Sequence, residues 1–109
     1  MAYDEDLADR IRNVLARYEG LTEQKMFGGI AFMVRGNMCC GVVKDDLMVR
    51  VGPVRYEQCL GEPGARPMDF TGRPMRGMVY VDGSACANGR TLAKWVNRGA
   101  EFAASLPKK

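Results

Sequence analysis

Apolar residues near both ends of the chain recur with the period of an α-helix. The N-terminal stripe consists of Leu7, Ile11, Val14, Leu15 and Tyr18. It predicts an amphipathic helix, and Gly20 is a typical stop signal. The C-terminal stripe consists of Leu92, Trp95, Val96, Gly99, Phe102, Ala103 and Leu106. It predicts a second helix that ends at Pro107, and the glycine on its apolar face indicates a close approach to the neighbouring element.

Between these helices, over residues 26–51, the period changes to two. Alternating apolar positions predict three strands, joined by short turns at Gly36-Asn37 and Asp45-Asp46. This spacing favours an antiparallel meander. Aspartate binds the local backbone in tight turns, so we interpret Asp45 and Asp46 as turn residues rather than as an acid–base pair.

The next segment predicts a short helix and two further strands. Gly52-Pro53 opens the helix, because proline suits the first helical position. Strands are expected at 66–70 and 78–81, and Pro67 places the first of them at a sheet edge. The order α-β-β-β-α-β-β-α predicts one two-layer α+β domain over residues 1–109, with a five-stranded, mainly antiparallel sheet and helices on one face.

Composition excludes several kinds of chemistry. The 109 residues contain no histidine, which excludes Ser-His-Asp and Cys-His catalysis and histidine metal ligation. Neither a P-loop nor a G-x-G-x-x-G fingerprint occurs, and we predict no catalytic residue, cofactor or metal. No apolar run approaches the ~20 residues of a membrane span, and no export signal opens the sequence, so we expect a cytoplasmic protein without a membrane partner.

The four cysteines are Cys39, Cys40, Cys59 and Cys86. Neighbours in a strand point to opposite faces, so we expect Cys39 and Cys40 to lie apart, and no C-x-x-C motif is present. We interpret the thiols as small hydrophobic groups in a reducing compartment. A redox role for Cys39 or Cys59 is the alternative.

Charge is distributed unevenly along the chain. Residues 1–24 hold six acidic and three basic side chains, whereas the other 85 residues hold seven acidic and thirteen basic ones. The second part therefore carries a net charge of +6, and Arg66, Arg73 and Arg76 form a candidate basic patch for nucleic acid. Solvated charges that never meet are the alternative.

Seven of the eight methionines lie in the middle of the chain. Met33 and Met48, together with Arg50, are expected on the sheet face opposite Ile30 and Phe32. Since helices should cover only one face, this candidate partner-binding face would be partly bare and suits a protein partner or a second copy. Gap filling in the core is the alternative for each methionine.

Five ordered blocks resemble the signature of the TfoX/Sxy N-terminal domain family. The first is Lys25-Met26-Phe27-Gly28-Gly29, whose glycine pair we interpret as a bend at the start of a strand, with ligand approach as the alternative. The others are Asp46-Leu47-Met48-Val49-Arg50-Val51, Arg66-Pro67-Met68, Gly77-Met78-Val79-Tyr80-Val81 and Leu92-x-x-Trp95-Val96. The resemblance covers nearly the whole chain and implies a compact α+β domain.

The resemblance also carries an expectation about function. The family includes regulators of competence-specific genes, which act in transcription alongside a cyclic-AMP receptor protein, and no catalytic residue is attributed to the domain. Full-length regulators carry a second, C-terminal domain, and we expect the sequence up to Lys109 to be a stand-alone N-terminal domain without it. We expect a non-enzymatic interaction domain that regulates transcription through contacts with a protein partner, and a homodimer through the sheet face or edge is compatible with this. Nucleic-acid binding and a small-ligand or redox-responsive role are the alternatives.

Overall fold

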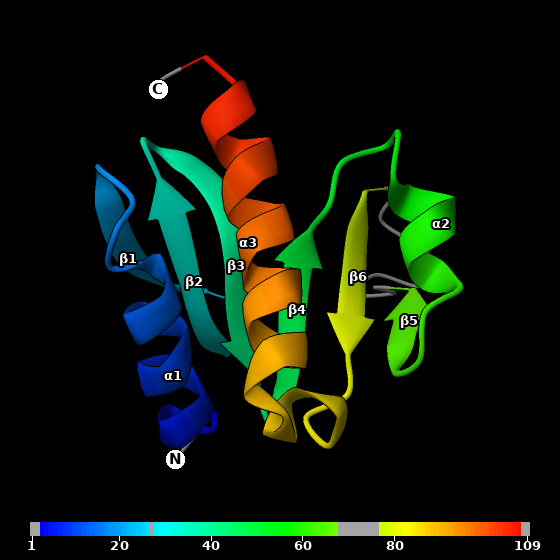
Figure 1. Ribbon diagram of the computed structural model, residues 1–109. Helices are drawn as coiled ribbons and strands as arrows, with labels where there is room; N and C mark the ends of the chain where they lie inside the picture. Colours follow the sequence, from blue (N-terminus) through cyan, green and yellow to red (C-terminus); the bar gives the residue numbers. More distant parts are fainter. Residues whose placement is uncertain (1–2, 27, 68–76, 108–109) are drawn as a thin grey trace.

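The fold is one antiparallel sheet with helices on one face, in a computed structural model that describes residues 3–26, 28–67 and 77–107 (Figure 1). The strand order is β1-β2-β3-β4-β6-β5, and every neighbouring pair is antiparallel. The elements are α1 (Glu5–Leu15), β1 (Leu21–Met26), β2 (Gly29–Val34), β3 (Asn37–Val43), β4 (Asp46–Arg50), α2 (Tyr56–Leu60), β5 (Ala65–Pro67), β6 (Met78–Val81), the 3₁₀ turn η1 (Ala85–Ala87) and α3 (Gly89–Ser105).

The predicted α+β class is confirmed, but the sheet has six strands instead of five. The additional strand is β1, whose residues are mostly polar and exposed. An edge strand has one neighbour and is partly solvated, so it needs no alternation of apolar residues. The short helix also begins later than predicted, at Tyr56 rather than beside Pro53. Among the described residues, no helix combines the length and apolar character that a membrane crossing requires.

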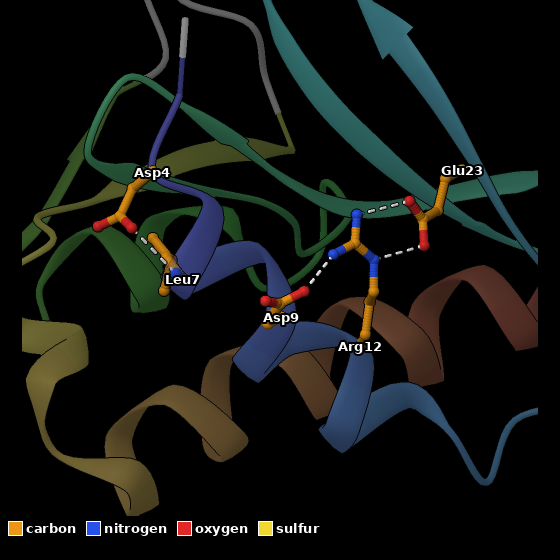
Figure 2. Close-up of polar contacts among 5 residues, drawn as sticks. All are labelled: Asp4, Leu7, Asp9, Arg12 and Glu23. Carbon is orange, nitrogen blue, oxygen red and sulfur yellow. Dashed lines mark hydrogen bonds and ion pairs between the residues drawn. The ribbon is translucent and has the colours of Figure 1, made fainter. Parts of the chain in front are cut away.

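Helix α1 is capped at its start and tied to the sheet near its end (Figure 2). Asp4 Oδ1 accepts a hydrogen bond from the Leu7 amide at 3.1 Å, which satisfies one of the free N–H groups of the first turn. Arg12 donates from Nε and Nη2 to the two carboxylate oxygens of Glu23 in β1, at 2.6 and 2.8 Å, and from Nη1 to Asp9. The arginine therefore joins the helical layer to the edge strand.

Helix α3 lies across the middle of the sheet, over β3 and β4. Asn88 caps it by accepting from the amides of Arg90 and Thr91, and its buried residues include Trp95. Gly99 faces β3 so closely that a β-carbon there would overlap the carbonyl oxygen of Cys39. The predicted close approach is thus confirmed, and glycine sets the spacing between helix and sheet.

A bulge between β2 and β3 changes where the adjacent cysteines point. Phe32 pairs with Cys40 and Met33 pairs with Met38, so Cys39 is an additional residue without a cross-strand partner. Both cysteines belong to the helix-side core, and their Sγ atoms lie 3.6 Å apart. The prediction of opposite faces was wrong, because a bulge interrupts strand alternation.

Candidate interaction site

The methionine-bearing face predicted as a docking surface is not brought together as expected. Met48 is 0% exposed and forms a small second cluster with Met78, on the sheet face away from the helices. Met33 is half-buried. The guanidinium carbon of Arg50 lies 5.2 Å from the ring centroid of Phe102 in α3, so this side chain reaches the helical layer. The prediction that this face is exposed was therefore wrong at Met48. Arg50 belongs instead to the surface around Phe102.

Of the predicted basic patch, the structure describes only Arg66. Its Nε donates to Asp82 Oδ1 at 2.7 Å, its Nη2 donates to Asp46 Oδ2 at 2.8 Å, and its guanidinium lies 5.2 Å from the Tyr80 ring centroid. Two carboxylates thus balance its charge, and Asp46 acts as an ion-pair partner in addition to its place beside the turn. Arg73 and Arg76 lie outside the described residues.

The motif Lys25-Met26-Phe27-Gly28-Gly29 forms the connection between β1 and β2, with Phe27 outside the described residues. Lys25 is exposed at the sheet edge. Gly28 has φ +74°, a conformation that favours glycine. A β-carbon at Gly29 would overlap the Val42 carbonyl oxygen. Gly28 is thus explained by the bend, and Gly29 by the close approach of β2 to β3.

A concave surface that sequence analysis did not identify lies between α2 and α3. It consists of two adjoining hollows of about 290 and 240 Å³ that share Arg55 and Arg98. We call this surface the α2–α3 groove; its walls include Val54, Arg55, Cys59, Glu62, Arg98 and Phe102. Glu62 and Arg98, which meet in this groove, lie 36 positions apart in the chain, so no local pattern could have revealed their pairing.

Arg98 is held firmly at the centre of the α2–α3 groove. Its Nη1 donates to Glu62, and its guanidinium carbon lies 4.8 Å from the ring centroid of Trp95. Lys94 Nζ donates to the other Glu62 oxygen at 2.9 Å. Burial raises the pKa of Glu62, but the hydrogen bonds from Lys94 and Arg98 outweigh this and leave that pKa below its usual value. Glu62 thus stays ionised and orients both cations.

The other end of the groove is apolar and open. Val54 is 96% exposed, which is unusual for a branched hydrophobic side chain, and Phe102 lies half-buried beside it under the Arg50 guanidinium. A β-carbon at Gly52 would lie 2.5 Å from Cε1 of Phe102, so glycine lets the ring pack against the chain. An apolar patch flanked by arginines results, as is typical of protein-binding surfaces.

Three of the cysteines, Cys40, Cys59 and Cys86, have a raised pKa. Burial raises the pKa of Cys59, although nearby Arg98 opposes this shift. Burial likewise raises the pKa of Cys86 to about 11. The Cys40 pKa is raised by the hydrogen bond with Cys39 and by burial. Because reactive cysteines depend on a lowered pKa and on access, these environments favour the interpretation of the thiols as packing groups.

Comparison with protein families identifies most of the chain. Residues 13–103 match the family described as TfoX N-terminal domain. The match includes the whole sheet, α2 and most of α3, but only the last three residues of α1. No curated protein and no solved structure matches the chain.

Proposed function

The chain belongs to the TfoX N-terminal domain family, which confirms the resemblance carried by the five sequence blocks and links it to competence regulation, and from this premise we propose that it is a non-enzymatic interaction domain. Its role is that of an accessory in transcription regulation, and it works by binding a protein partner, either a transcription factor or part of the transcription machinery. The absence of histidine and the buried, weakly acidic thiols support a role in binding rather than in catalysis.

The observation that carries this proposal is the α2–α3 groove. Exposed Val54 and half-buried Phe102 offer apolar contact, while Arg50, Arg55 and Arg98 surround them with groups that can bind carboxylates. Arginine beside apolar side chains is a common composition at protein interfaces. The partner segment that suits this groove presents apolar and acidic side chains together.

A capture experiment with matched variants tests the proposal. Tagged chain is incubated with nuclease-treated native lysate, and bound proteins are identified by mass spectrometry. Val54→Asp places a negative charge at the mouth of the groove, whereas Asn13→Asp adds the same charge on the exposed side of α1. We expect RNA polymerase or a transcription factor to bind the wild type and the Asn13→Asp control but not Val54→Asp. Equal capture by both variants, or no such protein at all, would overturn the proposal.

The same proteins distinguish the nucleic-acid alternative. Phosphate contacts release counterions, so true duplex binding weakens steeply as salt rises. Fluorescence anisotropy with labelled duplex DNA measures this directly. We expect no specific affinity; salt-sensitive, tight binding that Val54→Asp leaves intact would favour direct DNA contact over a protein partner.

A further inference from the structure

Strand β1 forms one edge of the sheet and pairs only with β2 (Figure 1). In the part of the chain that the structure describes, nothing pairs with its outer side. We propose that two copies of the chain associate through this edge, with their β1 strands antiparallel around a twofold axis at Gln24. The two six-stranded sheets would then form one continuous sheet. Strand β1 and α2 lie near opposite edges of the sheet, so the inference is independent of the α2–α3 groove.

The β1–β2 register shows which backbone groups are free to pair. The Arg35 amide donates to the Gly20 carbonyl oxygen at 3.0 Å, which marks these two as a hydrogen-bonded pair. Such pairs recur at every second residue of an antiparallel ladder, so Thr22 and Gln24 direct their N–H and C=O groups toward β2. Leu21, Glu23 and Lys25 therefore direct theirs outward.

The outward positions limit the possible registers of a second copy. Two copies can exchange hydrogen bonds only where outward residues stand opposite each other. An axis at Gln24 places Glu23 of each copy opposite Lys25 of the other, so the interface gains two pairs of opposite charge. An axis at Glu23 or Lys25 would place identical charges opposite each other, which destabilises a sheet. An axis at Thr22 would use only the first three residues of β1. The Gln24 register is favoured by both charge and length.

The two charged side chains are suited to this exchange. Glu23 is fixed by two hydrogen bonds from Arg12, and the hydrogen bonding lowers the pKa of Glu23, so its carboxylate is ionised and already oriented. Lys25 is exposed and makes no ion pair within residues 3–26, 28–67 and 77–107. The lysine of each copy would thus meet a preformed acceptor on the other.

Charged residues on an edge strand ordinarily discourage pairing with other chains. In β1 the opposite charges of Glu23 and Lys25 stand on either side of the polar Gln24. This arrangement lets the edge pair with a strand of complementary charge instead of repelling every strand. A strand that places like charges opposite Glu23 or Lys25 would be repelled, and an uncharged strand would gain neither ion pair. The expected occupant is therefore a second copy of this chain rather than a general β-strand.

Sedimentation velocity over a range of protein concentrations tests the pairing. We expect the wild type to shift from monomer to dimer as concentration rises. Lys25→Glu alone and Glu23→Lys alone should each weaken the dimer at least about tenfold, because each places like charges at both contact positions. An equimolar mixture of the two variants should restore association, since every contact then joins opposite charges. A wild type that stays monomeric, or a Lys25→Glu variant that dimerises like the wild type, would overturn the proposal.

Amide hydrogen exchange separates pairing at this edge from association elsewhere. The amides of Glu23 and Lys25 should become more protected as concentration rises, whereas those of Thr22 and Gln24 are already bonded to β2 and should change little. Lys25→Pro removes an outward N–H and the lysine charge but no N–H that bonds to β2, so its far-ultraviolet circular dichroism should match the wild type while its dimer is lost. A wild-type dimer in which Glu23 and Lys25 exchange independently of concentration would place the contact elsewhere and overturn the proposal.

Discussion

The two edges of the sheet carry the same arrangement of side chains, but its structural consequence differs. At each edge one arginine binds two carboxylates and lies over an aromatic ring. At the β1 edge, Arg12 comes from the helical layer, grips Glu23 and lies 5.7 Å from the Phe32 ring centroid. The contact fastens α1 to the strand but leaves the strand's outer backbone open.

At the β5 edge the arginine belongs to the strand itself. Arg66 reaches over Tyr80 of β6 to Asp46 of β4, and also binds Asp82 just after β6. The contact therefore ties the edge strand to its own sheet. Strand β5 is only three residues long and ends at Pro67, which has no N–H to offer a further strand. One edge is closed, and the other remains able to pair.

The largest expected effect comes from substituting the glycines between β1 and β2. Gly29→Ala would drive a methyl group into the Val42 carbonyl and separate β2 from β3, at an expected cost of about 3 kcal/mol in the free energy of unfolding. Gly28→Ala meets no atom within 4 Å and should cost only about 1 kcal/mol, through its positive φ. Urea denaturation measures both, and equal losses would contradict this account of the hairpin.

Alkaline pH should weaken the packing around η1, which contains Cys86. Burial raises the pKa of Cys86, next to β6, from 9.0 to about 11. The folded state therefore holds the thiol proton more tightly, and this stabilisation is complete below pH 9 and disappears as pH rises toward 11. We expect the free energy of unfolding to fall by up to about 2 kcal/mol across that window. Cys86→Ala should flatten the fall, and an unchanged slope would exclude this thiol as the cause.

Replacing Arg12 and Arg66 in turn compares the contacts at the two sheet edges directly. Arg12→Ala and Arg66→Ala should each cost about 1 kcal/mol, because both pairs are partly exposed to solvent. Their local effects should differ. Segment-resolved hydrogen exchange is expected to show faster exchange in β1 for Arg12→Ala and in β5 and β6 for Arg66→Ala. Uniform acceleration across the sheet would mean that neither contact acts on its own edge.

The smallest effect is the acid sensitivity of the β1 contact. The hydrogen bond from Arg12 lowers the pKa of Glu23 below 4.5, so the stabilisation is present above that pH and is lost as pH falls through the lowered folded-state pKa. The difference in unfolding free energy between wild type and Arg12→Ala should therefore shrink at acid pH. Denaturant titrations at several pH values would show it; a constant difference would mean that Arg12 stabilises mainly by packing.

The sequence was most informative where burial is continuous. The stripes from Leu7 and from Leu92 located both long helices, since a helix packed on a sheet must present one apolar face. Strand β1 escaped prediction because Thr22, Glu23 and Gln24 face solvent, and its place is determined by pairing with β2 rather than by its own composition.

The candidate site was much less predictable. The bulge that turns Cys39 toward Cys40 depends on the register between two strands, and the burial of Met48 depends on what the fold places over it. The α2–α3 groove depends on Arg98 meeting Glu62 across 36 positions of sequence. Such contacts arise from tertiary packing, so local patterns could indicate the residues but not their association.

The close packing of Gly99 against β3 would affect the outcome of a mutational screen for partner binding. It lies on α3 between Arg98 and Phe102, while its own face touches the backbone of β3. A larger residue there would lift the helix and move the groove wall with it. A saturation library would accordingly score Gly99 as a recognition hot spot, although no partner could reach it. The shape of the α2–α3 groove therefore depends on the spacing between α3 and β3 inside the molecule.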